Sequence, residues 1–202
     1  MQGCRAAWVP EAEDRDWEDA AELAAQWVEA ESSAQGARPV VVANGKHSAD
    51  DIGVLSRMAR QYGLATPRSR DSARGAGPVL AYVPTLETLE LAIRAARNSS
   101  LCVVEGVAQP LAGWAAAVNA EDPTNSEPTT PLDSDFIEVL NSLVSYGNNG
   151  WGDQFGKQQT QRRLARLPRE SLDPDFIASY MMGKGRSAHG AKNLKAIIEK
   201  LK

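Results

Sequence analysis

The chain has 202 residues, of which 43% are hydrophobic and 24% charged, and its net charge is −4. This composition is ordinary for a soluble globular protein that is large enough to bury a core of its own. With only two cysteines, Cys4 and Cys102, a disulfide scaffold is not expected. The first 20 residues are acidic rather than apolar, unlike a signal peptide, and no apolar stretch approaches the ~20 residues of a membrane helix. We therefore expect a cytoplasmic protein.

The charge is divided unevenly along the chain. Residues 151–202 hold 11 Lys or Arg and 5 Asp or Glu, a net of +6, which leaves −10 for residues 1–150. Such a division can mark a surface for nucleic acid or another anionic partner at the basic end. Two plainer explanations are that the halves attract each other, or that the basic helices are simply solvated.

Helical and strand-like patterns alternate through the first half of the chain. Residues 16–30 place apolar side chains at helical spacing, from Trp17 to Val28. Three apolar runs then predict buried strands, and each is followed by a helical pattern: PVVVAN at 39–44, PVLAYVP at 78–84 and LCVVEG at 101–106. Ser48 and Asp51 resemble a capping box before the helix that Gly63 ends, and Thr85 starts the next helix.

This alternation predicts an α/β fold. We expect residues 1–122 to form a small three-layer domain in which helices cover a parallel sheet built from repeated βα units. The short apolar run CRAAWVP at 4–10 is a candidate for one additional strand that finishes an edge.

A change of character follows residue 122. Residues 123–133 are rich in Pro and Thr and have no periodic apolar positions, which is typical of a linker. Residues 134–202 then predict an all-helical, basic domain. Gly147 ends its first helix, and Asp173 with Pro174 has the sequence of a helix N-terminus.

Polar residues follow the three predicted strands. In a parallel sheet they meet at one edge, where ligands bind in open α/β folds. We predict catalytic roles for Glu105 and His47, as general base and acid, and ligand contacts from Asn44, Lys46, Tyr82 and Thr85. Lys46 is suited to a phosphate or carboxylate. Polar side chains at strand ends also occur in any βα protein simply because loops are solvated.

The basic end offers a second candidate surface. On one helix, Arg162, Arg166 and Arg169 would share a face, and further cations surround the last turn and helix. We predict nucleic-acid contacts from Arg162, Arg166, Arg169, Lys184, Arg186 and Lys192.

No motif in the sequence names a reaction. It has no phosphate-binding loop, no Gly-x-Gly-x-x-Gly after a strand, no nucleophile elbow and no metal-ligand spacing, so we predict no cofactor and no metal, and leave open whether the protein is an enzyme. The first interpretation is a protein that associates with DNA or RNA through its C-terminal region. The alternatives are an enzyme or binding protein for a small anionic ligand at the strand ends, and a module that binds another protein.

Overall fold

The computed structural model describes residues 5–69, 77–125 and 127–201. No helix in these ranges is long and apolar enough to cross a membrane. The chain divides into two compact units. Residues 1–109 and 119–129 form the sheet unit, and residues 110–118 and 130–202 form the helical unit.

Within the described residues, the sheet unit is built on seven strands in the order β3-β2-β4-β5-β1-β6-β7. Neighbouring strands are parallel except for the β6–β7 pair at one edge. The strands are β1 (Ala6–Val9), β2 (Val40–Val42), β3 (Leu64–Ala65), β4 (Val79–Tyr82), β5 (Leu101–Val104), β6 (Glu121–Asp122) and β7 (Glu127–Pro128).

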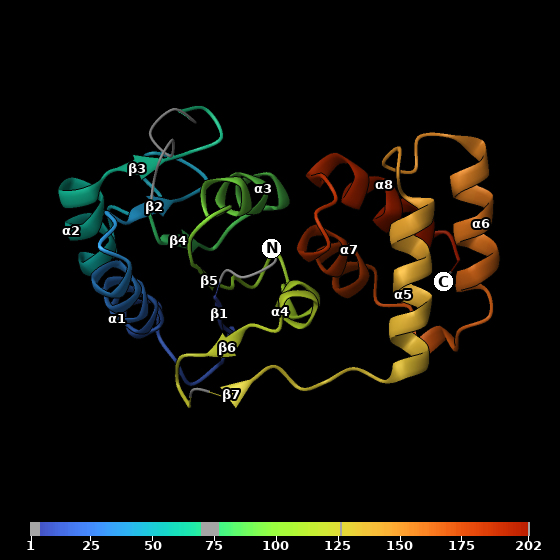
Figure 1. Ribbon diagram of the computed structural model, residues 1–202, viewed down its shortest axis with the longest axis horizontal. Helices are drawn as coiled ribbons and strands as arrows, with labels where there is room; N and C mark the ends of the chain where they lie inside the picture. Colours follow the sequence, from blue (N-terminus) through green and yellow to red (C-terminus); the bar gives the residue numbers. More distant parts are fainter. Residues whose placement is uncertain (1–4, 70–76, 126, 202) are drawn as a thin grey trace. The chain divides into compact units, whose positions relative to one another are not determined.

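Helices cover both faces of this sheet. Helices α1 (Trp17–Gln35) and α2 (Gly53–Tyr62) lie on one face, and α3 (Leu86–Ala95) lies on the other (Figure 1). Side chains in register across three strands, Ala7, Leu80 and Cys102, share one core with α1 and α2. The strands are apolar at consecutive positions because both faces are buried. The predicted α/β class with a parallel sheet is confirmed.

Two strands differ from the prediction. The segment expected to finish an edge forms β1, which lies inside the sheet between β5 and β6. The edge strand beside β2 is β3, whose two residues, Leu64 and Ala65, follow helix α2 after Gly63. A two-residue strand is too short to leave a periodic pattern in the sequence.

The start of α2 also differs. Ser48 and Asp51 do not cap it: the helix begins at Gly53 after Ile52, which provides no side-chain cap. Instead the carboxylate of Glu18, in the first turn of α1, accepts hydrogen bonds from the amides of Gly53 (3.0 Å) and Val54 (3.1 Å). The first turns of α1 and α2 are therefore joined by a cap from a distant part of the sequence.

The helical unit consists of α4 (Ala112–Val118), α5 (Ser134–Tyr146), α6 (Gln154–Leu164), the short 3₁₀ helix η2 (Arg169–Ser171), α7 (Pro174–Gly183) and α8 (Ala188–Glu199). Its core surrounds Trp151, which is fully buried and donates from Nε1 to Thr160 Oγ1 at 2.9 Å. The predicted starts and ends are confirmed at two helices, since Asp173 caps α7 with Pro174 in its first turn and Gly147 follows α5. The helical C-terminal region is thus also confirmed.

Candidate functional site

The carboxyl ends of β2 and β4 form a topological switch point in the sheet. These strands are neighbours, yet the chain leaves β2 toward α2 on one face and leaves β4 toward α3 on the other. The two connections diverge, and in open α/β sheets ligands bind beyond the carboxyl ends of the strands at such a point. The residues that follow β2 and β4 are therefore the first candidates for a site.

Asn44 joins the two diverging connections. Its Nδ2 donates to the carbonyl of Val83 at 2.7 Å. Its Oδ1 accepts from the Thr85 amide at 3.0 Å and from Thr88 Oγ1 at 2.6 Å. Because these bonds occupy both ends of the side-chain amide, the main role of Asn44 is to fix the end of β2 to the turn between β4 and α3.

Val83, at the centre of that turn, has an unusual backbone conformation. Its φ of 43° lies in the left-handed region, which a β-branched residue rarely adopts. Its amide donates to Val104 O at 2.9 Å, and its side chain lies so close to Gly106 that a Cβ there would meet Val83 Cγ1 at 2.2 Å. Such strain costs about 1–3 kcal/mol and persists only where the surroundings impose it, often at functional sites.

A pocket of about 730 Å³ opens beside this turn, at the ends of β2 and β3. The described residues that line it are Asn44, Gly45, Lys46, His47, Ser48, Thr66, Pro67 and Arg68. Two of them, Lys46 and Arg68, are exposed cations. The pocket thus combines a positive wall with hydroxyl groups from Ser48 and Thr66.

Only three of these eight lining residues, Asn44, Lys46 and His47, were predicted as site residues from the sequence. Thr66 and Arg68 follow β3, and that two-residue strand leaves no periodic pattern in the sequence. Thr66 is buried, and its Oγ1 hydrogen bonds with Ser69 Oγ at 3.0 Å, which shapes this wall of the pocket. The one available signal was the pair of residues Leu64 and Ala65 directly after Gly63, the predicted helix end.

His47 is oriented by a neighbour on its own turn. Its Nδ1 lies 2.7 Å from Asp50 Oδ2, and the His47 side chain is 92% exposed. A pair this exposed contributes little to stability. His47 therefore lines the pocket as an exposed side chain whose Nδ1 is paired with Asp50.

The helix that follows this pocket does not offer its N-terminus to an anion. Glu18 already accepts hydrogen bonds from the first two amides of α2, at Gly53 and Val54. An anion in the pocket must instead be held by side chains, chiefly the ammonium of Lys46 and the guanidinium of Arg68.

The other predicted residues lie outside this pocket's lining. Glu105 is buried and accepts from the Glu11 amide at 3.1 Å, and Thr85 caps α3. Burial, and secondarily the charge of Glu18, raises the pKa of Tyr82. Because β4 separates β2 from β5, the ends of those strands are about 10 Å apart, at two strand spacings. The pairing of Glu105 with His47 stays a prediction.

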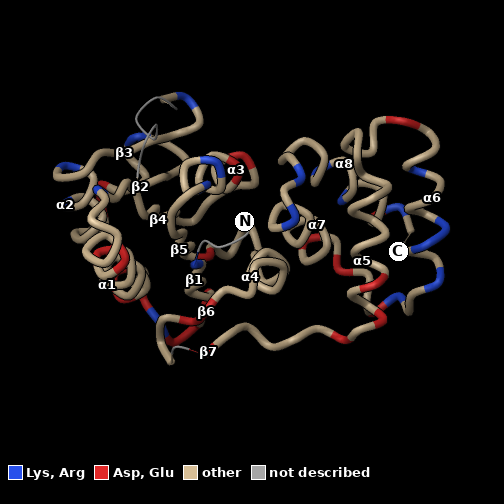
Figure 2. The backbone as a smooth tube through the Cα atoms, in the orientation of Figure 1, with Lys and Arg blue, Asp and Glu red and all other residues tan. Residues whose placement is uncertain are grey.

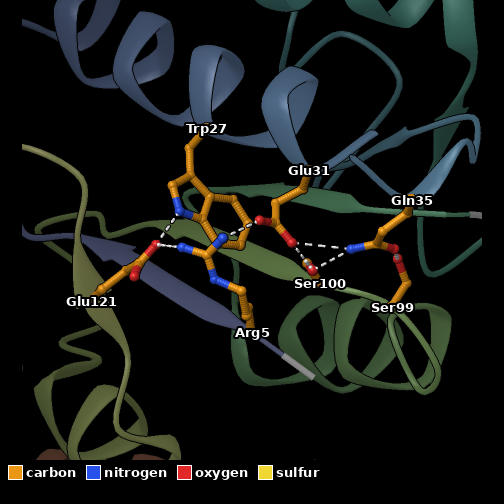
Figure 3. Close-up of polar contacts among 7 residues, drawn as sticks. All are labelled: Arg5, Trp27, Glu31, Gln35, Ser99, Ser100 and Glu121. Carbon is orange, nitrogen blue, oxygen red and sulfur yellow. Dashed lines mark hydrogen bonds and ion pairs between the residues drawn. The ribbon is translucent and has the colours of Figure 1, made fainter. Parts of the chain in front are cut away.

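A polar network that was not predicted from the sequence lies at the amino ends of strands β1 and β5, the opposite end of the strands from the pocket (Figure 3). The guanidinium of Arg5 bridges two carboxylates, those of Glu31 and Glu121. Glu31 is only 6% exposed and also accepts from Gln35 (3.0 Å) and Ser100. The whole network comprises Arg5, Trp27, Glu31, Gln35, Ser99, Ser100 and Glu121. Its groups bind one another, so it joins α1 to the sheet.

The prediction that Arg162, Arg166 and Arg169 share one helical face is wrong. Helix α6 ends at Leu164, so only Arg162 lies on it, while Arg166 and Arg169 follow. Figure 2 shows several Lys and Arg positions, in blue, on and near α6. Arg162, Arg166 and Arg169 are exposed, as is Lys192 on α8.

Two of the predicted cations are held by their own unit. Lys184 Nζ donates to Ala117 O at 2.9 Å and lies 5.1 Å from the centre of the Tyr180 ring. Arg186 Nη1 donates to Asn148 Oδ1 at 3.3 Å. These two side chains therefore have structural contacts of their own besides any role in binding.

Comparison with known proteins identifies no relative by sequence. No family model matches the chain, and no curated protein matches it. Among solved structures, maleylacetate reductase from Agrobacterium tumefaciens aligns with a TM-score of 0.35 and 14% identity, over 96% of this chain and 63% of that chain. At this level the similarity supports no conclusion about function.

Proposed function

We propose that the sheet unit binds a small anionic molecule in the pocket at the ends of β2 and β3. The observation that carries the proposal is the lining: Lys46 and Arg68 face one pocket from two different loops, and the described residues that line it include no Asp or Glu. The volume of about 730 Å³ lies within the range of small-molecule sites.

The chemistry of the lining suggests a phosphate or carboxylate group on a polar molecule. A guanidinium can bind two oxygens of such a group at once, and an ammonium adds a point charge. The hydroxyls of Ser48 and Thr66 can donate to further oxygens of the ligand. Asn44 acts indirectly, because its hydrogen bonds fix the rim of the pocket to the strained turn at Val83.

A thermal-shift experiment separates this pocket from the rest of the sheet edge. Pyrophosphate, citrate and glucose 6-phosphate serve as probes, with glucose as the uncharged control. We expect at least one anion to raise the melting temperature of the wild type and of Glu105→Gln, and to lose most of that effect in Lys46→Met. If Glu105→Gln abolishes the shift and Lys46→Met keeps it, the ligand binds at the β5 end and the proposal is wrong.

A second candidate function is nucleic-acid binding by the helical unit. The observation in its favour is the exposure of Arg162 and Arg166 at and just beyond the end of α6. Phosphate contacts by such arginines would make affinity for DNA or RNA fall steeply with salt, with a log–log slope of about −0.9 per neutralised phosphate of a duplex.

Salt titrations of single- and double-stranded oligonucleotides test this second function. Replacing both arginines, in Arg162→Gln/Arg166→Gln, should flatten the slope by about 2 if each contacts one phosphate. The matched control is Arg57→Gln/Arg60→Gln, which removes the same charge from α2 in the sheet unit. Binding that is absent, or that responds equally to both double variants, removes this candidate.

A further inference from the structure

Two helices of the helical unit begin with the same sequence. Residues 132–137 read LDSDFI and residues 172–177 read LDPDFI, at the starts of α5 and α7. In each, the first Asp accepts hydrogen bonds from two amides: Asp133 from residues 135 (2.9 Å) and 136 (3.1 Å), and Asp173 from residues 175 (2.9 Å) and 176 (3.1 Å). The shared sequence thus gives two helix starts with the same capping geometry.

An apolar pocket of about 590 Å³ lies between these two helix starts. The rings of Phe136 and Phe176 are 6.1 Å apart between centroids, tilted by 32°. The remaining apolar lining comes from Val139 on α5 and from Leu167 and Pro168 in the segment after α6. A pocket of this size and lining suits the flat apolar body of a small molecule.

The polar groups at the pocket select the charge of that molecule. Asp133, Asp135 and Asp173 line it, and the described lining residues include no Lys, Arg or His. Two amides at each helix start are already bonded to the capping carboxylate, Asp133 or Asp173. An anion would therefore meet three carboxylates at the pocket, whereas a cation would be attracted.

We propose that this pocket binds a small organic cation: an amine or amidinium carried by an aromatic or similarly flat apolar body. The apolar body lies against Phe136, Phe176 and Leu167, and the charged group reaches the carboxylates of Asp133, Asp135 and Asp173. The faces of the two phenylalanine rings add a further attraction for a nearby cation. This site is independent of the anion pocket in the sheet unit and requires the opposite charge.

Three probes with the same indole body test the proposal: tryptamine (cationic), tryptophol (neutral) and indole-3-acetate (anionic). Isothermal titration calorimetry on the full-length protein measures their affinities. Because three carboxylates attract the ammonium group, we expect tryptamine to bind roughly three- to ten-fold more tightly than tryptophol, and indole-3-acetate to bind most weakly. Raising the salt concentration should reduce the preference for tryptamine.

Two variants locate the site without touching the caps. Asp135→Asn removes a lining charge that caps neither helix, and should bring tryptamine affinity toward that of tryptophol. Ser171→Trp fills the pocket from the short helix η2 and should abolish binding of all three probes. The matched control for charge is Glu199→Gln, an exposed acid on α8 outside the lining, and it should leave tryptamine binding unchanged.

The proposal is overturned if the wild type binds none of the three probes, or binds all three equally. It is also overturned if tryptamine binding survives both Asp135→Asn and Ser171→Trp, since the probe would then occupy a different surface. Unfolding curves for both variants establish that they retain the folded state of the wild type.

Discussion

Val83 is the residue whose conformation most depends on its surroundings. A β-branched residue at a φ of 43° is held there by the Val104 carbonyl, by Asn44 and by the close approach of Gly106. Gly106 therefore has a steric reason to be glycine that is separate from any role in binding. The sequence contained no sign of this, because it depends on how two neighbouring strands end.

Gly106→Ala should destabilise the protein. The added Cβ would lie 2.2 Å from Val83 Cγ1, so the turn must shift, at a cost of about 1–3 kcal/mol in the free energy of unfolding. The control is Gly45→Ala, where a Cβ would lie 3.5 Å from Ser48 Oγ, an ordinary contact, and the expected change is within about 0.5 kcal/mol. Urea unfolding measures both. If Val83→Ala does not reduce the cost of Gly106→Ala, the clash is not its cause.

The raised pKa of Tyr82 predicts how the stability of the fold changes at alkaline pH. Burial, and then the charge of Glu18, raises the pKa of Tyr82 above its usual 10.0. The folded state therefore keeps this proton more tightly than the unfolded state. The resulting stabilisation is complete below pH 10 and is lost as the pH rises through the folded pKa.

Ultraviolet absorbance of the phenolate follows this titration. Burial also raises the pKa of Tyr180, so Tyr82→Phe and Tyr180→Phe should each remove one late-titrating group. Glu18→Gln should lower the pKa of Tyr82 only part of the way, because burial is the larger cause. A pKa for Tyr82 at its usual 10.0 in the folded protein would contradict the structure.

At the scale of elements, the first turn of α2 depends on a side chain from α1. Glu18→Ala removes the acceptor of two amide hydrogen bonds, and we expect a loss of about 1 kcal/mol in unfolding free energy, as for other lost caps. Faster hydrogen exchange at the Gly53 and Val54 amides should accompany it. Glu22→Ala, one turn later on α1, is the control and should leave both amides unchanged.

The caps also explain which elements could be predicted from the sequence. Asp173 and Thr85 bond to amides within three residues, so their local sequence was sufficient to place the starts of α7 and α3. Glu18 and Gly53 are far apart along the chain, and the local pair Ser48 and Asp51 suggested a cap that does not form. Predictions failed where the partner came from another element.

In the candidate site, too, the residues in a recognisable local pattern were predicted, and those placed by tertiary contacts were not. Asn44, Lys46 and His47 were predicted because they directly follow an apolar run that is recognisable as a strand. Thr66 and Arg68 were not, because β3 has only two residues and its position beside β2 is decided by tertiary pairing. Which of the strand-end residues share a pocket depends on strand order, and that order cannot be read from a single sequence.

At the scale of the whole molecule, local charge differs from the charge of each half of the chain. Residues 1–150 carry a net charge of −10, yet they include the cationic pocket of Lys46 and Arg68. The helical unit contains the whole basic end, residues 151–202, yet an apolar pocket in it is lined by three aspartates. The division of charge along the sequence therefore does not by itself indicate what binds where. The two pockets provide separate predictions for anions and cations.

Calorimetric titration tests the anion site at the ends of β2 and β3 most directly. The wild type and Lys46→Met/Arg68→Gln are titrated with whichever anion gives the largest thermal shift. We predict that the double variant binds this anion at least about ten-fold more weakly, a loss of about 1.4 kcal/mol, while Arg60→Gln on α2 binds it as the wild type does. Equal affinity in the wild type and the double variant would contradict an anion site at the ends of β2 and β3.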